Sequence, residues 1–335
     1  MKAHLLVIAV FLAASAAAQD KVKRIGEIEF FGSGGIDLNK LRAALPFHEG
    51  DEFRFETMEE KLRQSAEAVK QVTGHSPTDM APTCCDDRGN WIIYVGVSRK
   101  TVRYNPPPKG ASPVLPKNVL NIYERFMSAL MEGVQAGKAA EDRSKGYALS
   151  EYPPLRSTQL EMRAYAVGRE ALLRTVLEKC RNDQQRIVAS ELLGFARQSR
   201  SQLNALVQAT HDGNGTVRNN ATRALLVLVD SNSNLRRAIP VEGFIHLLSS
   251  GTWTDLNKTG SLLELITRDR NPTLLARLRK AEVQESLIEM ARWRTGHAGA
   301  ARYILGRIAG VDEELLQQLV TSGDLEEILS RLQHR

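Results

Sequence analysis

The cysteines are the residues whose chemistry depends most directly on spacing. Of the three, Cys84 and Cys85 are adjacent and Cys180 stands alone. Neighbouring cysteines can form a strained vicinal disulfide that is labile to reduction, and one thiol is then left over. The alternative is two small side chains on a strand with no cross-link. The spacing therefore leaves a redox role and a structural role open.

Motifs of the common enzyme classes are absent from the 335 residues. There is no HExxH zinc motif, no CxxC, no P-loop and no GxSxG nucleophile elbow. The seven histidines are scattered, with no pair at i, i+4. The GSGG run at 32–35 lacks the rest of a phosphate fingerprint and predicts a turn. These absences favour a protein that is not an enzyme and uses neither a cofactor nor a metal.

Two short segments combine tryptophan with polar side chains. The run SGTWTDLNK contains Trp253 and Asp255, and EMARWRTGHAG contains Trp293 and His297. Aromatic bulk beside polar tips is the mixture favoured at binding hot spots. The alternative is that both tryptophans fill gaps between helices. Partner binding is the functional hypothesis for these four residues.

The first residues have the pattern of a secretory signal peptide. Lys2 precedes an apolar run of about ten residues at 5–14, which is too short to span a bilayer. Ala16-Ala17-Ala18 then supplies the small residues of a cleavage site. The sequence predicts a signal peptide over 1–18, with an uncleaved anchor as the alternative. We expect an exported protein, periplasmic or secreted, without a membrane span in the mature chain.

Overall composition is that of a globular protein. Hydrophobic residues make up 42% and charged residues 25% of the chain. Lys plus Arg is 45 against 39 for Asp plus Glu, a net charge of +6. Over this length such an excess is mild and does not point to a nucleic-acid partner. The length favours about two domains.

Residues 21–103 predict a small α+β domain. A strand at 26–31 precedes a helix capped by Asp37, and a second helix is expected from Thr57 to Gly74. Residues 79–85 and 91–97 predict a hairpin, in which alternate residues from Trp91 share one face.

A Pro-rich segment at 104–117 follows and cannot form regular helix or sheet. We expect it to act as a linker between two cores. Residues 118–154 then predict a helix and a long polar loop. Because long loops inside a domain are often functional, four loop residues are candidates for testing, although a solvated loop is the alternative: Asp142, Arg143, Lys145 and Tyr147.

The rest of the chain, 155–335, contains a repeating pattern. Apolar residues at i, i+3, i+4, i+7 recur in segments starting at Ala189, Ala221, Thr259 and Ala301. Another predicted helix precedes each segment. One helix pair cannot bury both of its faces, so neighbouring pairs must stack. The pattern predicts an α-solenoid, and hence a mostly α protein.

One repeat carries a family resemblance. The run HDGNGTVRNNATRALLVLVD resembles the second helix of a HEAT repeat, in particular the HEAT-like class of phycobilin (PBS) lyases, and NDQQRIVASELLGFA is a weaker match. The resemblance implies a binding surface. It also implies that Asp212, Arg186 and Arg218 bond to neighbouring repeats and are structural.

The resemblance also implies a binding groove. In HEAT arrays the first turns of the second helices often line the concave face. Together with the residues of the two tryptophan segments, these positions give the partner-binding candidates Asn219, Asn220, Arg223, Trp253, Asp255, Asn257, Lys258, Trp293, His297 and Arg302.

The N-terminal segment IGEIEFFGSGGIDLNKLRAALPFHEGD is similar to a POTRA domain, the small module of outer-membrane assembly and secretion proteins. That resemblance implies partner binding by strand addition at a sheet edge. Taken together, the sequence predicts an exported, non-enzymatic protein–protein interaction scaffold whose partner is an unidentified protein. The alternatives are an envelope assembly factor and a groove-based enzyme similar to HEAT-like bilin lyases or DNA glycosylases, with Trp253, Asp255, Trp293 and Arg302 as its candidates.

Overall fold

The computed structural model describes residues 23–100, 102–110, 112–138 and 140–334. The predicted signal peptide at 1–18 lies outside these ranges. The described chain is mostly helical with a small three-stranded sheet, which confirms the expected mostly α class. None of its helices is both long and apolar enough to cross a membrane.

The N-terminal part has the predicted order strand, helix, helix, strand, strand. Its elements are β1 (Ile25–Phe31), α2 (Leu38–Ala44), α3 (Phe55–Thr73), β2 (Asp79–Cys84) and β3 (Trp91–Gly96). The sheet order is β1-β3-β2, with β3 parallel to β1 and antiparallel to β2.

The helix ends in this part follow local chemistry. The Asp37 side chain caps α2, as expected, by accepting from the backbone N–H groups of Asn39 and Lys40. Helix α3 starts earlier than Thr57 and has no side-chain cap at its N-terminus. Gly74 ends α3 in the left-handed conformation that glycine adopts without strain.

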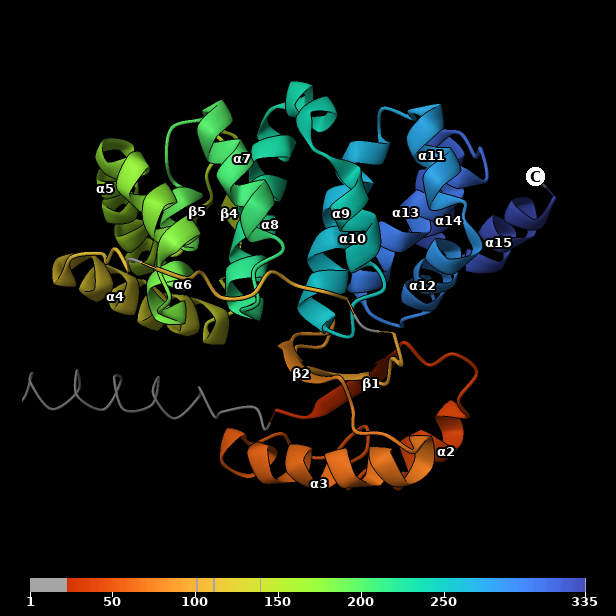
Figure 1. Cartoon of the computed structure of the whole chain (residues 1–335). Coiled ribbons are helices and arrows are strands. Elements are labelled where there is room, and N and C mark those ends of the chain that lie inside the picture. Colours follow the sequence, from red (N-terminus) through yellow and green to blue (C-terminus); the bar gives the residue numbers. More distant parts are fainter. Residues whose placement is uncertain (1–22, 101, 111, 139, 335) are drawn as a thin grey trace, which may run out of the picture.

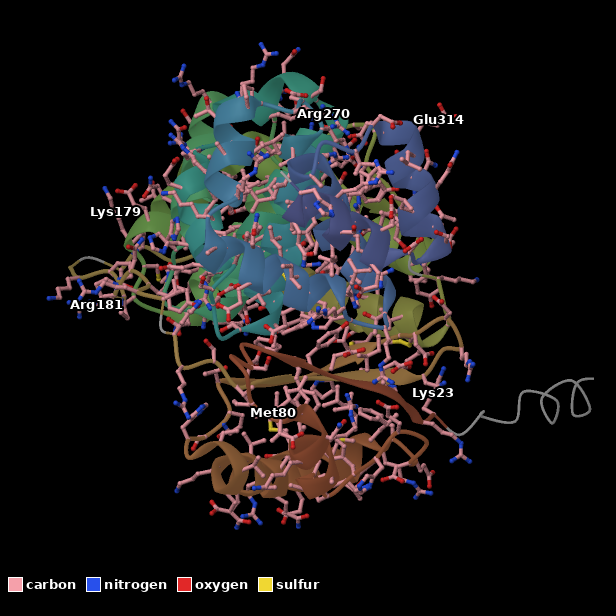
Figure 2. The ribbon with its side chains drawn as sticks, turned by 90° about the vertical axis from the view of Figure 1, so that its right-hand side faces the viewer. Lys23, Met80, Lys179, Arg181, Arg270 and Glu314 are labelled. Atoms are coloured by element: carbon pink, nitrogen blue, oxygen red, sulfur yellow. A yellow bond between two sulfur atoms is a disulfide. The ribbon has the colours of Figure 1, made fainter. Side chains whose placement is uncertain are left out.

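Both faces of the sheet are buried, each in a different hydrophobic cluster. Ile93 and Val95 pack towards α2 and α3, as the alternation from Trp91 predicts. Ile92 and Tyr94 point the other way, into the core of the helical part. Figure 1 shows the sheet between the α2–α3 layer and the remaining helices, and Figure 2 shows Met80 between the sheet and that layer. The sheet therefore belongs to two packing layers at once.

The helical part follows in chain order across the view of Figure 1. Its elements are α4 (Lys117–Gln135), β4 (Glu141–Asp142), β5 (Leu149–Ser150), α5 (Pro153–Lys179), α6 (Asp183–Leu193), α7 (Arg200–Ala209), α8 (Gly215–Ser231), η1 (Ser233–Ala238), α9 (Val241–Leu247), α10 (Trp253–Thr267), α11 (Pro272–Leu278), α12 (Ala281–Ala291), η2 (Gly296–Ala298), α13 (Gly299–Ile308), α14 (Glu313–Ser322) and α15 (Leu325–Gln333).

The four predicted apolar segments lie on α6, α8, α10 and α13. These helices pack against one another in that order, and each also packs against a helix before it in the sequence, such as α7 against α8. Asparagine side chains cap the N-termini of α6 and α8, and an aspartate side chain caps that of the later helix α14. The result is a row of neighbouring helices, of which α8 and α10 are buried over most of their residues.

The Pro-rich segment at 104–117 is docked along this row. The Tyr104 hydroxyl donates to Asp255 Oδ2 at 2.8 Å, and the Asn105 N–H donates to the His211 carbonyl at 2.7 Å. Further along, the Leu115 N–H donates to Gln185 Oε1 at 2.6 Å. The segment therefore contacts the helices at both of its ends rather than acting as a free spacer.

Candidate functional site

A groove of about 790 Å³ runs across α8, α10 and α13, and we call it the α8–α10–α13 groove. Most of the lining residues on each helix recur three or four positions apart, as on one helix face. They are Arg223, Leu226 and Asp230 of α8, Lys258, Ser261, Glu264, Leu265 and Arg268 of α10, Gly299, Ala300, Tyr303 and Arg307 of α13, and Arg143, Glu313 and Gln317.

At one end of the groove, two arginines converge on a carboxylate from the β4–β5 hairpin. Arg143 lies 3.3 Å from Glu141, and Arg223 pairs with the same Glu141. Arg223 also lies 3.7 Å from Glu191 of α6. Burial raises the pKa of Glu191. The hairpin thus supplies the cation Arg143 to the groove wall, and its Glu141 pairs with the groove residue Arg223.

At the other end, the arginines are paired with carboxylates of α10 and α14. Arg307 is buried and lies 3.0 Å from Glu264 and 2.9 Å from Glu313. Arg268 lies 3.0 Å from Glu264 as well. The buried guanidinium of Arg307 is therefore held in a fixed geometry between the two carboxylates.

Lys258 lies half-buried in the groove wall and differs from these arginines. In the described part of the chain its amino group has no ion-pair or hydrogen-bond partner. Burial, then the positive charges of Arg223 and Arg143, lower the pKa of Lys258 to about 8, against the smaller opposing effects of Glu141 and Glu191. The groove therefore contains one cation that the chain itself leaves without a counter-ion among the residues described.

The sequence candidates divide into two groups. Arg223 and Lys258 line the groove. Asn219 and Asn257 are half-buried on α8 and α10. Asn220 is buried, and its Nδ2 donates to the Ile187 carbonyl at 3.3 Å.

Arg302 is half-buried on α13 beside the groove residue Tyr303. Its Nε donates to the Ala291 carbonyl at 2.9 Å. The Arg302 side chain therefore ties α13 to the end of α12 and is not among the residues that line the groove.

The two tryptophans are buried against the sheet, which corrects their assignment to the groove. Tyr94 of β3 is fully buried, stacks on Trp253 with ring centroids 4.8 Å apart and meets Trp293 edge-on at 5.1 Å. The Trp293 Nε1–H donates to the Phe30 carbonyl of β1 at 3.0 Å. Both tryptophans therefore fill the space between sheet and helices, the alternative left open by the sequence.

His297 belongs to the same aromatic cluster. Its Nδ1 lies 2.7 Å from the Tyr94 hydroxyl, which is also 2.7 Å from Thr295 Oγ1. Burial, with a further effect from Lys258, lowers the pKa of His297 to about 4. His297 is therefore neutral at physiological pH and serves the sheet–helix contact.

Asp255 is also part of the scaffold rather than of the groove. It is 3% exposed and accepts from Arg218 Nε at 3.0 Å, from the Tyr104 hydroxyl and from Ser250 Oγ. The Arg218 guanidinium lies 3.7 Å over the Tyr104 ring. Asp255 lies only three residues before Lys258 in the sequence, so the sequence alone does not separate the inward-facing Asp255 from the groove residue Lys258.

Similar pairs join other neighbouring helices. The Arg186 Nε donates to Asp212 Oδ2 at 2.8 Å, and Arg186 is 1% exposed. Arg218, as described above, reaches Asp255 on the next long helix. The structural role expected for Arg186, Asp212 and Arg218 is thus confirmed by their contacts.

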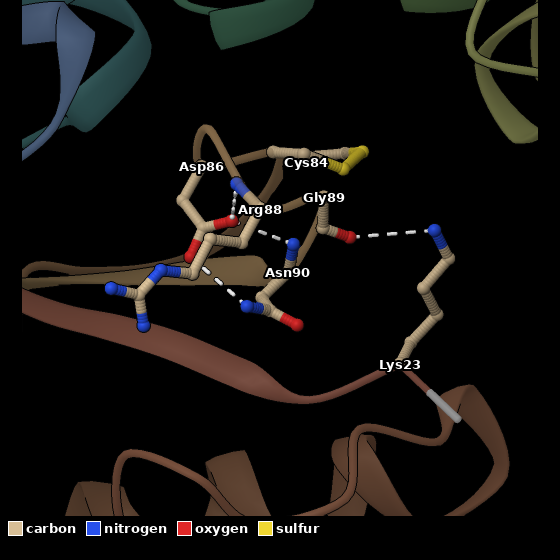
Figure 3. Close-up of a disulfide and its surroundings, with 7 residues drawn as sticks. Lys23, Cys84, Asp86, Arg88, Gly89 and Asn90 are labelled. Carbon is tan, nitrogen blue, oxygen red and sulfur yellow. Dashed lines mark hydrogen bonds between the residues drawn. A yellow bond between two sulfur atoms is a disulfide. The ribbon is translucent and has the colours of Figure 1, made fainter. Parts of the chain in front are cut away.

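The adjacent cysteines form a disulfide at the end of β2 (Figure 3). Cys84 and Cys85 are half-buried, whereas Cys180 is a free, buried thiol. The following turn is held by Asp86 Oδ1, which accepts from the backbone N–H groups of Arg88 and Asn90. No group of three or more acidic, His or Cys side chains within the described ranges could hold a metal ion.

Sequence reasoning missed most of the groove. It flagged Arg143 only as part of a long loop, and it did not single out Tyr303, Arg268 or Arg307. The sequence signal that could have indicated them is their distance along the chain from predicted candidates. Tyr303 directly follows Arg302, and Arg268 lines the same groove as Lys258, ten residues before it. Comparison with protein-family models, with curated proteins and with solved structures gave no match for this chain.

Proposed function

We infer that the chain is an exported, non-enzymatic protein–protein interaction scaffold that holds a polypeptide segment in the α8–α10–α13 groove. The observation that carries this proposal is the groove itself. It has a volume of about 790 Å³ and mixes charged side chains with Tyr303, Leu226 and Leu265. Such a polar surface around a few apolar side chains is typical of non-obligate protein interfaces.

We extend the proposal to the fold by describing the helical part as an α-solenoid of HEAT-like pairs. Support comes from the ordered packing of α6, α8, α10 and α13. Further support comes from the arginine–carboxylate contacts between neighbours, Arg186 with Asp212 and Arg218 with Asp255. Arrays of this kind present extended concave surfaces to partners.

The alternative of strand addition at the N-terminal sheet is less well supported. The Ile28 N–H donates to Glu49, the Phe30 carbonyl accepts from Trp293, and the Gly32 N–H donates to Glu289. These bonds occupy backbone groups along β1, an edge strand. The other edge strand, β2, contains Pro82, which has no N–H to offer a partner. This favours the groove over a sheet edge.

A groove enzyme built on Trp253, Asp255 and Trp293 is also disfavoured. All three side chains are buried in contacts with the sheet or the Pro-rich segment. They are not exposed to a substrate in the groove.

Affinity capture from the native envelope fraction tests the scaffold proposal. The variant Tyr303→Ala should lose the partner that wild type captures, because Tyr303 lies in the groove wall. The matched control is Tyr165→Ala, which truncates a half-buried tyrosine on α5 outside the groove. Equal capture by wild type and Tyr303→Ala would contradict the proposal, provided that both variants give the same circular dichroism spectrum.

A further inference from the structure

The geometry points to Lys258 as the recognition site for a carboxylate of the partner, so that the groove selects an acidic polypeptide segment. This inference rests on the proposed function and deepens it by naming the chemistry of the partner. The occupant is a segment carrying Asp or Glu side chains, whose carboxylate meets the Lys258 amino group.

Charge pairing along the groove supports this choice. Arg143, Arg223, Arg268 and Arg307 each have a carboxylate partner from the chain itself. Lys258 has none among the residues described. A charged group that is half-buried without a counter-ion is unfavourable, because it loses hydration and gains no ion pair. A ligand carboxylate would supply the missing contact.

The surroundings of Lys258 explain why an anion is favoured there. The charged groups around it are Arg223 of α8, Arg143 and Glu141 of the β4–β5 hairpin, and Glu191 of α6, and the neutral His297 of η2 is a further titratable neighbour. The two arginines disfavour the protonated amine more strongly than the two carboxylates favour it.

An added carboxylate would shift that balance towards the ammonium form. Binding therefore couples to protonation. Since the pKa of Lys258 is lowered to about 8, the free protein at pH 8 carries a roughly half-protonated amine. A bound carboxylate should complete the protonation and take up as much as ~0.5 proton per ligand. A merely structural lysine would not produce this uptake on addition of an acidic peptide.

The test uses the full chain and a defined probe, acetyl-hexaglutamate amide, with acetyl-hexaglutamine amide as the uncharged control. Titration calorimetry at pH 8 in HEPES and in Tris separates proton uptake from the binding heat, because the two buffers have different ionisation enthalpies. The variant is Lys258→Met, and its matched control is Lys280→Met, an exposed lysine outside the groove.

We expect hexaglutamate to bind wild type and Lys280→Met equally, with proton uptake. Lys258→Met should bind about tenfold more weakly or worse, because one charge-assisted contact is worth about 1.5–3 kcal/mol, and its uptake should vanish. Hexaglutamine should not bind. Equal affinity and equal uptake in Lys258→Met would overturn the inference, as would failure of wild type to bind hexaglutamate.

These outcomes separate the inference from the function on which it rests. If Tyr303→Ala abolishes partner capture while hexaglutamate does not bind, the groove is an interaction site but Lys258 does not select carboxylates. If capture is insensitive to Tyr303→Ala and hexaglutamate does bind, the anion site stands without the scaffold role.

Discussion

The buried Arg218–Asp255 pair allows the sharpest test of the distinction between scaffold and groove. Asp255 accepts from Arg218, Tyr104 and Ser250, and both members of the pair are 3% exposed. Asp255→Leu removes the acceptor and leaves the Arg218 guanidinium buried without its counter-ion. Breaking such a pair costs about 3–5 kcal/mol, a large share of the ~5–15 kcal/mol that stabilises a typical domain.

Urea unfolding followed by far-UV circular dichroism gives the free energy of unfolding. Three variants complete a thermodynamic cycle: Asp255→Leu, Arg218→Met and the double variant. The double variant should be less destabilised than the sum of the single variants, by about 0.5–3 kcal/mol, because it leaves no unpaired charge. Lys280→Met, a change at an exposed lysine, serves as the control and should change stability by at most about 0.5 kcal/mol.

The reasoning fails if Asp255→Leu costs less than about 1 kcal/mol, or if the two single variants are additive. Either result would mean that the Asp255 carboxylate is solvated rather than part of the buried contact. A partner-binding defect in Asp255→Leu without any loss of stability would indicate that Asp255 contacts the partner.

The remaining predictions concern the contact between sheet and helices. Because the pKa of His297 is lowered to about 4, the unfolded state binds more protons than the folded state between pH 6.5 and 4, so stability should fall by up to about 3 kcal/mol as pH drops through that window. Urea unfolding at pH 7 and 4.5 measures this loss, and the free energy of unfolding of His297→Asn should depend less on pH than that of wild type. The same pH dependence in both proteins would contradict the prediction. Trp293→Phe keeps a ring but removes the donor to the Phe30 carbonyl, and the resulting loss of about 1–3 kcal/mol should appear as a lower urea midpoint; an unchanged midpoint would mean that water replaces the bond. A fragment of residues 104–335 should bind the dye ANS and unfold less cooperatively than the full chain, since it exposes Trp253 and Trp293; a cooperative fragment that excludes the dye would show two independent cores.

Local patterns predicted the elements well. The apolar spacing on α6, α8, α10 and α13 reflects burial of one helix face, a property set by neighbouring residues in the sequence. The Asp37 cap and the Gly74 stop likewise depend on backbone geometry within a few residues.

The role of the tryptophans could not be predicted in the same way. Trp253 and Trp293 stand beside polar residues, as tryptophans at binding hot spots do, but tryptophans that pack in a core can have the same sequence neighbours. Their partner, Tyr94, comes from a distant strand. Only the packing of the sheet onto the helices decides between the two uses.

The groove was predictable in part for a related reason. Arg223 and Lys258 lie on helix faces that periodicity can place. Glu141 and Arg143 come from a hairpin inside a loop with little regular pattern, so nothing local indicates that they reach α8. Ion pairs across such distances depend on tertiary structure alone.

The burial of both sheet faces has a consequence for the timing of synthesis. The contact between Tyr94 and Thr295 joins residues separated by 201 positions. At about 5–20 residues per second, Tyr94 leaves the ribosome roughly 10–40 s before the residues that cover it. During that interval the sheet face that carries Ile92 and Tyr94 is not yet covered by the helices. We therefore expect chaperones to bind the N-terminal part until the last helices are synthesised.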